Sequence, residues 1–341
     1  MGKRAEQPQN SAADFPLDES PLDEIPMGEP SSHHSRRLKR PDRRLQRELH
    51  SSDFIFDVEV AYGSLAHLTR VGGRPALGDY IQRLWQRRHF IWRESRSKVS
   101  TQNSRNRLGS AWLVLRPILD ALFYWMIFGV ILQAGRGLPN YVAFVIIGVF
   151  MFQFTSSSLS GGVDSIRSAR ALIRAFTFPR ASIVISLVTR NFLQRVPAVV
   201  VMFIMIAAIP PHAPPTPTWL LFPVVLVLHT VFNLGIALFV ARLGHSWPDF
   251  SQATSFIVRI LMYGSAVIFP IERFVNRFPT ILTIVELNPV YAFLSAYRSL
   301  LIDGVVPGPM LWVQLVAWAA GALVVGFLWF WSNEESYASA Q

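Results

Sequence analysis

The feature that most constrains this chain is a series of six apolar blocks that follow one another along its last two thirds. Each block is close to the ~20 residues that an α-helix needs to cross the hydrocarbon core of a bilayer. The sequence therefore predicts an all-α polytopic membrane protein with six transmembrane helices. The predicted spans are Ala111–Gln133, Tyr141–Leu159, Ile183–Ile209, Trp219–Ala241, Phe250–Phe269 and Met310–Trp331.

The distribution of basic residues predicts the orientation of these spans. Of the 32 Lys and Arg residues, 19 precede the first block and four lie between the second and third, whereas the loop Pro210–Thr218 has none. Cytoplasmic loops carry the excess of Lys and Arg, so the N-terminal head and the second loop are expected in the cytoplasm. An even number of spans returns the tail to the same side, and the stretch Ile271–Gly308 is then external.

Composition agrees with a membrane protein and divides the chain into four parts. The net charge of +10 is concentrated beside the first span, which favours contact with anionic headgroups over nucleic acid. The chain has no Cys, which excludes disulfides and thiol chemistry, and its acidic, Pro-rich start does not resemble a signal peptide. The expected parts are a largely disordered basic head (1–76), an amphipathic helix with a polar connector (77–107), the transmembrane domain (108–331) and a tail (332–341).

The segment Leu77–Arg93 has its apolar residues at helical spacing on one face and its polar residues on the other. Two Trp and flanking Arg residues predict that this helix lies in the membrane interface and does not cross the membrane. The alternative is an amphipathic helix that packs on another protein domain. The residues that we expect at the interface are Trp85, Arg87, Arg88 and Trp92.

A second short amphipathic helix is predicted between the second and third spans. Asp164 can cap a helix that begins at Ser165, and Pro179 ends it. One stripe of this helix is apolar, with Ile166, Ala169, Ile173 and Phe176, and the other stripe carries Arg167, Arg170 and Arg174. The helix is either a docking surface for a soluble partner or a basic loop that only fixes topology.

Three sequence motifs resemble one family, in that family's order. They are LGSAWLVLRPILD from Leu108, LIRAFTFPR from Leu172 and LNPVYAFLSAYRSLLIDG from Leu287. They are similar to signatures of the ABC-2 type membrane subunits of polysaccharide-exporting ABC transporters, which export O-antigen, teichoic acid and capsule. The similarity covers about Leu77 to Trp331.

This resemblance implies a homodimer of six-span subunits in the bacterial cytoplasmic membrane, bound to two copies of a separate ATPase subunit that holds ATP and Mg²⁺. It implies that the loop helix, with Asp164, Arg167, Arg170 and Arg174, contacts the ATPase, and that short re-entrant helices lie externally between spans five and six. The implied substrate is a lipid-linked polysaccharide such as O-antigen, teichoic acid, capsule or a cell-wall galactan.

Arg190 and Arg195 fall inside the third predicted span and depart from the family's pattern. An Arg at the centre of a bilayer costs about 2.5–3.5 kcal/mol on insertion scales. Both are therefore expected near the cytoplasmic end, where the side chain reaches the surface, or facing a wet interior. The functional alternative is a contact with the pyrophosphate of a lipid-linked sugar.

The sequence contains no motif typical of a catalytic or metal site. None of the three Lys residues lies in a phosphate-binding loop, so the chain is not expected to hydrolyse ATP, and no catalytic or metal-ligating residue is predicted. His229, alone inside a span, is expected to be packed or hydrogen-bonded. A membrane glycosyltransferase or acyltransferase needs paired acids, and a secondary transporter usually has internal repeats or intramembrane acids. These two classes are the alternatives to a transport subunit.

Aromatic residues in the spans give the substrate hypothesis. Rings can stack on the C–H faces of sugars, although aromatics in spans mostly pack against neighbours or anchor at the interface. Two pairs, each spaced four residues apart on one helix face, are predicted to line the substrate channel. They are Tyr124 with Phe128 and Phe150 with Phe154.

Overall fold

The computed structural model describes residues 75–102, 109–131, 140–176, 178–208, 215–270 and 285–339. All of them belong to the second of the two units into which the chain divides, Arg70–Gln341. Every regular element in these ranges is helical, which confirms the all-α fold. The predicted head up to residue 74, and the part of the predicted external stretch at residues 271–284, lie outside the described residues.

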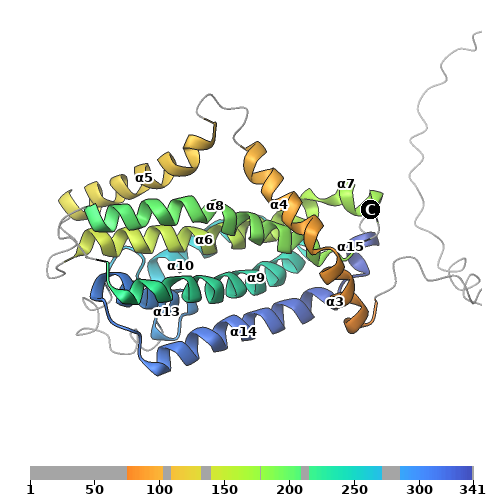
Figure 1. The fold of residues 1–341 in the computed structure, drawn as a ribbon. Helices are drawn as coiled ribbons and strands as arrows, with labels where there is room; N and C mark the ends of the chain where they lie inside the picture. The colour runs from red at the N-terminus through yellow and green to blue at the C-terminus, as the bar shows by residue number, and fades with distance from the viewer. Residues whose placement is uncertain are drawn as a thin grey trace, which may run out of the picture. The chain divides into compact units, whose positions relative to one another are not determined.

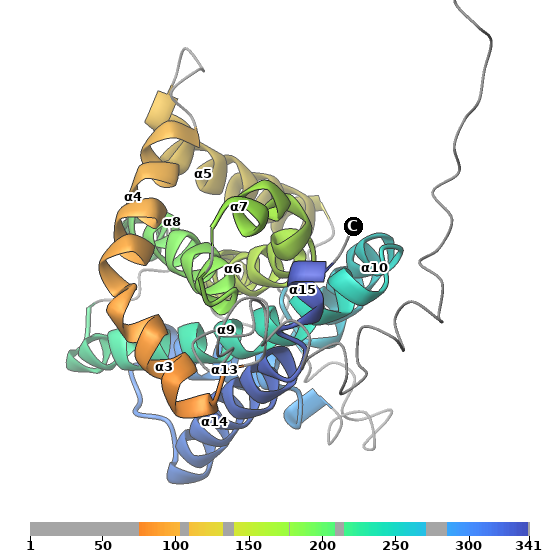
Figure 2. The ribbon, with the colours of Figure 1, turned by 90° about the vertical axis from the view of Figure 1, so that its right-hand side faces the viewer.

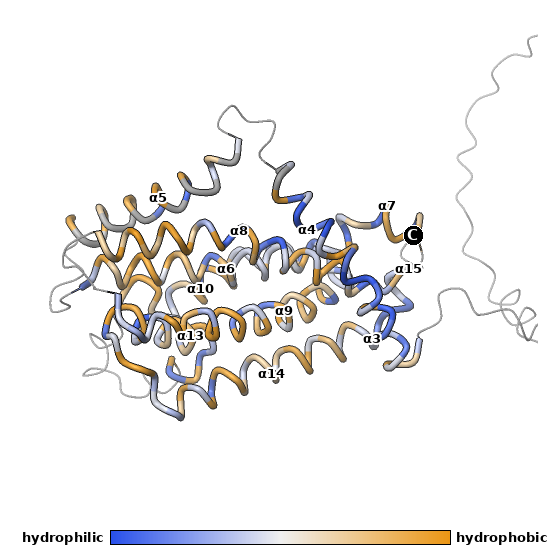
Figure 3. Tube along the Cα trace, viewed as in Figure 1, coloured by the Kyte–Doolittle hydropathy of each residue, from blue (hydrophilic) through white to orange (hydrophobic). Residues whose placement is uncertain are grey.

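Four helical segments of the described chain are long and apolar enough to cross a membrane, which makes this an integral membrane protein. They correspond to the predicted spans two, three, four and six, and they run side by side in Figure 1. Figure 3 shows hydrophobic residues along most of their length. The segments are α6 (Tyr141–Ser168), α8 (Ala181–Ala208), η4 (Pro217–Leu221) with α9 (Phe222–Ser246), and α14 (Pro309–Trp331).

The first and fifth predicted spans form shorter helices. The first begins with the 3₁₀ turn η2 (Gly109–Ala111), continues as α5 (Trp112–Tyr124) and changes to the π-helix η3 (Trp125–Ile131). The fifth is α10 (Phe250–Gly264), whose 15 residues extend only about 22 Å along the helix axis. α5 packs on α6 and α8, and α10 packs on α6. That these two segments cross the membrane stays a prediction.

α6 lies at the centre of the helix bundle and contacts α8, α9, α10 and α13. Its buried residues include Ile146, Ile147 and Met151, which are at most 1% exposed. α14 packs along α9 at a close approach of Gly326 to Gly235, where a Cβ added to Gly326 would lie 2.0 Å from the Gly235 carbonyl oxygen. The main core is therefore formed by the span-length helices themselves.

A short helix, α13 (Pro289–Arg298), lies between α10 and α14 in the sequence and continues as the π-helix η5 (Ser299–Asp303). Its first turn is capped by Asn288, whose side-chain oxygen accepts from the backbone N–H of Val290 at 2.9 Å. Phe293 and Tyr297 are fully buried against the bundle. A helix is thus present where the external re-entrant helices are expected, and its entry into the membrane stays a prediction.

Four short helices gather at the opposite end of the bundle from α13, as Figures 1 and 2 show. We refer to this end as the α7 end. The predicted amphipathic helix is present there as two helices that meet at Arg87, and Figure 3 shows that they are largely hydrophilic. The four helices are α3 (Leu77–Gln86), α4 (Arg88–Gln102), α7 (Arg170–Ala175) and α15 (Ser336–Ser339).

Candidate functional site

At the α7 end, three segments that are far apart in sequence meet at one buried carboxylate. Glu334 follows the last span and is 1% exposed. The Tyr80 hydroxyl of α3 donates to its Oε2 at 2.9 Å. The Arg180 backbone N–H and Nη1 donate to its Oε1 at 2.9 and 3.2 Å. The Tyr80 hydroxyl in turn accepts from the Ala181 N–H at 3.1 Å, and we call this group the Glu334 clasp.

The electrostatics of the Glu334 clasp follow from its burial. Burial raises the pKa of the Glu334 carboxyl, and its contacts with Arg180 and Tyr80 act in the opposite direction. Burial also raises the pKa of the Tyr80 hydroxyl, which therefore remains a donor. Removal of one member leaves a buried polar group unsatisfied, which is more costly than the loss of one exposed hydrogen bond.

The sequence does not predict the Glu334 clasp. Tyr80 is one of the apolar residues at helical spacing in Leu77–Arg93, and no sequence motif indicates a role for Glu334. The Tyr80 ring lies on the apolar face of α3, 6.0 Å from the ring of Phe327 in α14, and its hydroxyl reaches the Glu334 carboxylate. The only signal in the sequence is an acidic residue just after the last predicted span, and nothing in the sequence indicates that this residue is buried.

One prediction about the loop helix is wrong. Asp164 does not cap a helix at Ser165, because α6 continues without a break to Ser168. Its carboxylate instead accepts from the Ser251 hydroxyl at the start of α10, at 3.2 Å. The chain turns at Ala169, and the separate helix α7 has only six residues.

The structure separates the three predicted coupling arginines into two kinds. Arg167 donates to the carbonyl oxygens of Gly244 and Pro248 at the end of α9, at 3.1 and 3.2 Å. Arg170 and Arg174 expose their side chains on α7. The predicted apolar stripe holds for Ile173, which is buried, but Phe176 at its end is 63% exposed. Whether these residues contact an ATPase stays a prediction.

The four residues expected at the membrane interface lie along α3 and α4. Trp85 is 70% exposed, Trp92 is 49% exposed, and Arg87 and Arg88 are exposed. The Arg88 guanidinium lies 5.2 Å from the centre of the Trp85 ring and donates to the Trp85 carbonyl at 3.2 Å. α4 packs on α8 in part through the Ser95 hydroxyl, which donates to the Ser186 carbonyl at 2.9 Å.

α8 runs unbroken through Arg190 and Arg195. Arg195 is 7% exposed, and its Nη1 donates to the Gln153 side chain of α6 at 3.3 Å. The Nε atoms of both arginines are buried and have no hydrogen-bond partner among the described residues. Arg195 therefore points into the helix bundle at mid-helix, and the contact with a pyrophosphate stays a prediction for both arginines.

His229 has the surroundings expected of a packed histidine. Its Nε2 lies 2.7 Å from the Thr155 hydroxyl, and its Nδ1 lies 3.3 Å from the Tyr297 hydroxyl. Its ring stacks on Phe293 at a centroid distance of 4.6 Å. Within the described ranges, no group of three or more His, Asp or Glu residues is placed to hold a metal ion.

The aromatic residues predicted to line a channel lie in different surroundings. Phe150 and Phe154 are at most 1% exposed, and Phe154 packs edge-on against His229. Tyr124 ends α5 and Phe128 lies in η3, but their side chains are outside what the structure describes. A substrate could reach Phe150 or Phe154 only if the surrounding helices separated. A role in the channel stays a prediction for all four.

Known proteins with one shared name are similar to this chain over much of its length. The O-antigen export system permease protein RfbA of Myxococcus xanthus is 23% identical over 268 residues, which cover 76% of this chain and 98% of that protein. A protein of the same name from Klebsiella pneumoniae is 25% identical over 201 residues, which cover 58% of this chain and 74% of that protein.

The match to a family model covers the central part of the bundle. It extends over residues 88–302, from α4 to η5, and so takes in more than half of the chain. This range includes α7, with the exposed Arg170 and Arg174, and α8, with Arg190 and Arg195. The chain therefore belongs to the ABC-2 type transporter family.

Proposed function

We propose that this chain is the membrane permease subunit of an ABC transporter that exports a lipid-linked polysaccharide across the bacterial cytoplasmic membrane. The observation that carries the proposal is the similarity to an O-antigen export permease over 98% of that relative's length. The family membership favours a transport subunit over a membrane transferase or a secondary transporter. O-antigen, teichoic acid, capsule and cell-wall galactan all have the required chemistry.

The proposed topology has six spans with both termini in the cytoplasm. Together, α5 and η3 cover Trp112–Ile131, and 20 helical residues extend about 30 Å, the thickness of the hydrocarbon core. On α10, Phe256, Ile260 and Tyr263 form an exposed stripe at i, i+4 and i+7. We assign this stripe to the contact between the two subunits of the proposed homodimer.

The proposed source of energy is a separate ATP-binding subunit, present in two copies, that binds ATP and Mg²⁺. We assign its docking to the exposed face of α7, with Arg170 and Arg174. The buried Ile173 anchors the opposite face of α7 in an apolar cluster with residues of α3, α6, α8, α9, α14 and α15. A force on α7 would therefore act on a packed element and not on a free loop.

The Glu334 clasp supports a route for the conformational change. α7 leads within a few residues to Arg180 and Ala181, which hold Glu334 and Tyr80. A displacement of α7 would therefore move the start of α8, the interface helix α3 and the segment after α14 together. ATP binding would shift the population between two arrangements of these elements, as differential contacts require.

The experiment that tests this function is co-expression of the chain with an ABC ATP-binding subunit from the same genome. The double variant Arg170→Glu with Arg174→Glu should lose co-purification of the ATPase, or lose polymer export while ATP hydrolysis continues, because the docking face reverses its charge. The matched control, Arg170→Lys with Arg174→Lys, keeps the charge and should retain both. Export is measured as polymer at the cell surface. Normal export by the glutamate variant would contradict the assignment of α7, and ATP hydrolysis by the purified chain alone would contradict the proposed function.

A further inference from the structure

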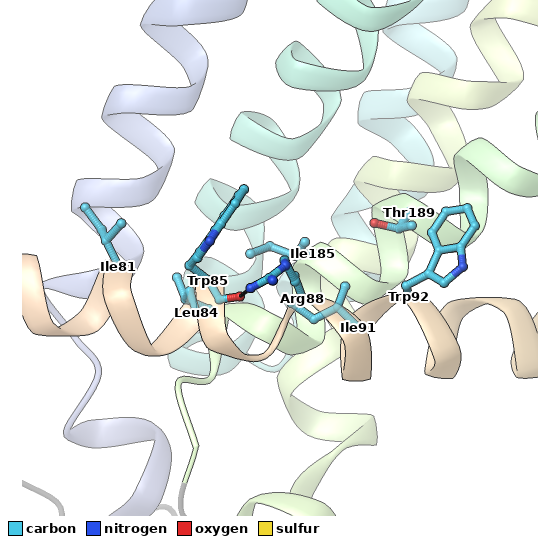
Figure 4. Close-up of a pocket in the computed structure, with 8 residues that line it drawn as sticks. All are labelled: Ile81, Leu84, Trp85, Arg88, Ile91, Trp92, Ile185 and Thr189. Carbon is cyan, nitrogen blue, oxygen red and sulfur yellow. Dashed lines mark hydrogen bonds between the residues drawn. The ribbon is translucent and has the colours of Figure 1, made fainter.

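A groove lies in the angle between α8 and the two helices α3 and α4, which we call the interface helices. Its volume is about 370 Å³, within the range of sites that hold small organic ligands. Figure 4 shows Ile81, Trp85 and Trp92 extending from one side of α3 and α4 toward the longer helices. The lining residues are Ile81, Leu84, Trp85, Arg88, Ile91, Trp92, Ile185 and Thr189.

The location of the groove determines what covers it in a membrane. α8 is a span-length helix that begins at Ala181, so Ile185 and Thr189 lie in its second and third turns. The groove opens on the side of α3 and α4 that faces the longer helices, and six of its eight lining residues are apolar. Water in such a groove would find few polar partners, whereas an acyl chain replaces it favourably. The lipid of the surrounding bilayer has the matching chemistry.

The charge at the groove selects among lipids. Arg88 is the only charged residue that lines it, and its guanidinium is held near the Trp85 ring at 5.2 Å and the Trp85 carbonyl at 3.2 Å. Residues 77–102 carry six Lys and Arg against two Asp and Glu, so the surroundings are also positive. A cation at the mouth of an apolar groove is complementary to a phosphate with an attached hydrocarbon chain.

We propose that this groove binds an anionic phospholipid of the bilayer. Its headgroup phosphate contacts Arg88 at the level of the interface helix, and one acyl chain runs along α8 past Ile185 toward Thr189. The bound lipid fills the space between α3, α4 and α8 and holds the interface helix at a fixed depth. The site depends on the membrane location of the chain and not on the identity of the exported polymer, so it can fail or succeed independently of the proposed function.

The test uses the full chain in nanodiscs of phosphatidylcholine alone or of an equal mixture with phosphatidylglycerol. Native mass spectrometry after release identifies the retained lipid and the oligomeric state together. The wild type should retain phosphatidylglycerol in preference, and Arg88→Gln should lower that fraction about fivefold, the effect of one lost cation near a membrane surface. Arg87→Gln removes the same charge from the adjacent residue, which does not line the groove, and should lower that fraction clearly less. Arg88→Lys should restore most of the binding.

A second variant tests the apolar part of the groove. Thr189→Phe places a ring in the space proposed for the acyl chain and should abolish retention of either phospholipid while circular dichroism remains helical. If that variant does not fold, the comparison of Arg88→Gln with Arg87→Gln decides alone. Equal losses in both arginine variants would overturn the proposal, because the lipid would then respond to general surface charge. It is also overturned if the retained mass is a polyprenyl phosphate, or if a second copy of the chain covers the groove and excludes lipid.

Discussion

At the scale of single residues, several polar side chains are buried, and most of them have hydrogen-bond partners. Glu334 receives donors from Tyr80 and from Arg180. His229 contacts hydroxyl groups on two different helices. Such interactions are stronger in a low-dielectric interior than in water, and they favour one arrangement of the helices over others.

The first prediction concerns the pH dependence of stability at Glu334. Because the pKa of this carboxyl is raised above its ordinary value of 4.5, the folded chain holds a proton that the unfolded chain has already released. The stability that it contributes is therefore complete below pH 4.5 and is lost as the pH rises through the raised pKa. The groups that face it are the charged guanidinium of Arg180 and the neutral hydroxyl of Tyr80.

The measurement is the thermal unfolding temperature in detergent from pH 4.5 to neutral. Glu334→Gln keeps the shape and most hydrogen bonds but cannot titrate, so its unfolding temperature should decline less with rising pH than that of the wild type. Glu335→Gln, at the exposed neighbouring position, should follow the wild type. Parallel curves for all three proteins would show that Glu334 does not titrate in this range.

Single residues were the least predictable part of the site. The spacing of Tyr80 correctly indicates the packed face of α3, but the destination of its hydroxyl depends on a residue 254 positions away. Likewise, the composition of the third span identifies Arg195 as unusual, and only the packing of α8 on α6 shows that it reaches Gln153. Local patterns indicate which face of a helix is buried, and they do not indicate which long-range partner lies there.

At the scale of elements, small residues set the distances between the longer helices. A Cβ added to Gly235 would lie 2.3 Å from the backbone carbon of Ala322, and a Cβ added to Gly244 would lie 2.1 Å from the Val163 carbonyl oxygen. Membrane helices often approach closely at such positions, because no side chain separates their backbones. α9 is thus held closely against α14 on one side and α6 on the other.

The second prediction follows from this close packing. Gly235→Ala should destabilise the protein by about 1–3 kcal/mol or more, since the added methyl group forces α9 and α14 apart. Gly321→Ala is the matched control on α14, because nothing lies within 4 Å of its added Cβ. That control should be neutral or slightly stabilising, since Ala has the higher helix propensity. Thermal unfolding in detergent distinguishes the two, and similar unfolding temperatures would show that the helices can move apart without loss.

The elements were predicted well where hydrophobicity decides and poorly where packing decides. The four span-length helices lie where the apolar blocks predict them. The prediction of a new helix at Ser165 was wrong because it rested on Asp164 as an N-cap, and α6 runs through this residue to Ser168. In the structure, Gly162 lies against Ala237 of α9, and this tertiary contact keeps the helix continuous. The change to a π-helix at Trp125 has no signal in the sequence that we can identify.

At the scale of the whole bundle, the described helices carry different groups at their two ends. The exposed arginines of α7, the interface helices and the Glu334 clasp lie at one end, and α13 lies at the other (Figure 1). The positive residues therefore concentrate where the sequence predicts the cytoplasm. The orientation itself was predicted from charge alone.

The third prediction tests that orientation in a chain without cysteines. Single cysteines in place of Ser168, which is exposed at the end of α6, and Pro215, which is exposed before η4, lie at opposite ends of the span-length helices. Ser168→Cys should react with a membrane-impermeant maleimide only after the cells are opened, and Pro215→Cys should react in intact cells. The reversed pattern would invert the topology. Labelling of both sites from the same side would exclude an odd number of crossings between them.

The separation of Tyr80 and Glu334 in the sequence also determines when their hydrogen bond can form during synthesis. A ribosome that adds about 5–20 residues per second needs about 13 to 50 s to synthesise the 254 positions between them. Throughout that interval the α3 hydroxyl lacks its final acceptor, while the spans that follow it are being inserted. Tyr80 can therefore complete its hydrogen bond only after α14 and Glu334 have been synthesised, and a chain cut short before Glu334 would leave its hydroxyl without this acceptor.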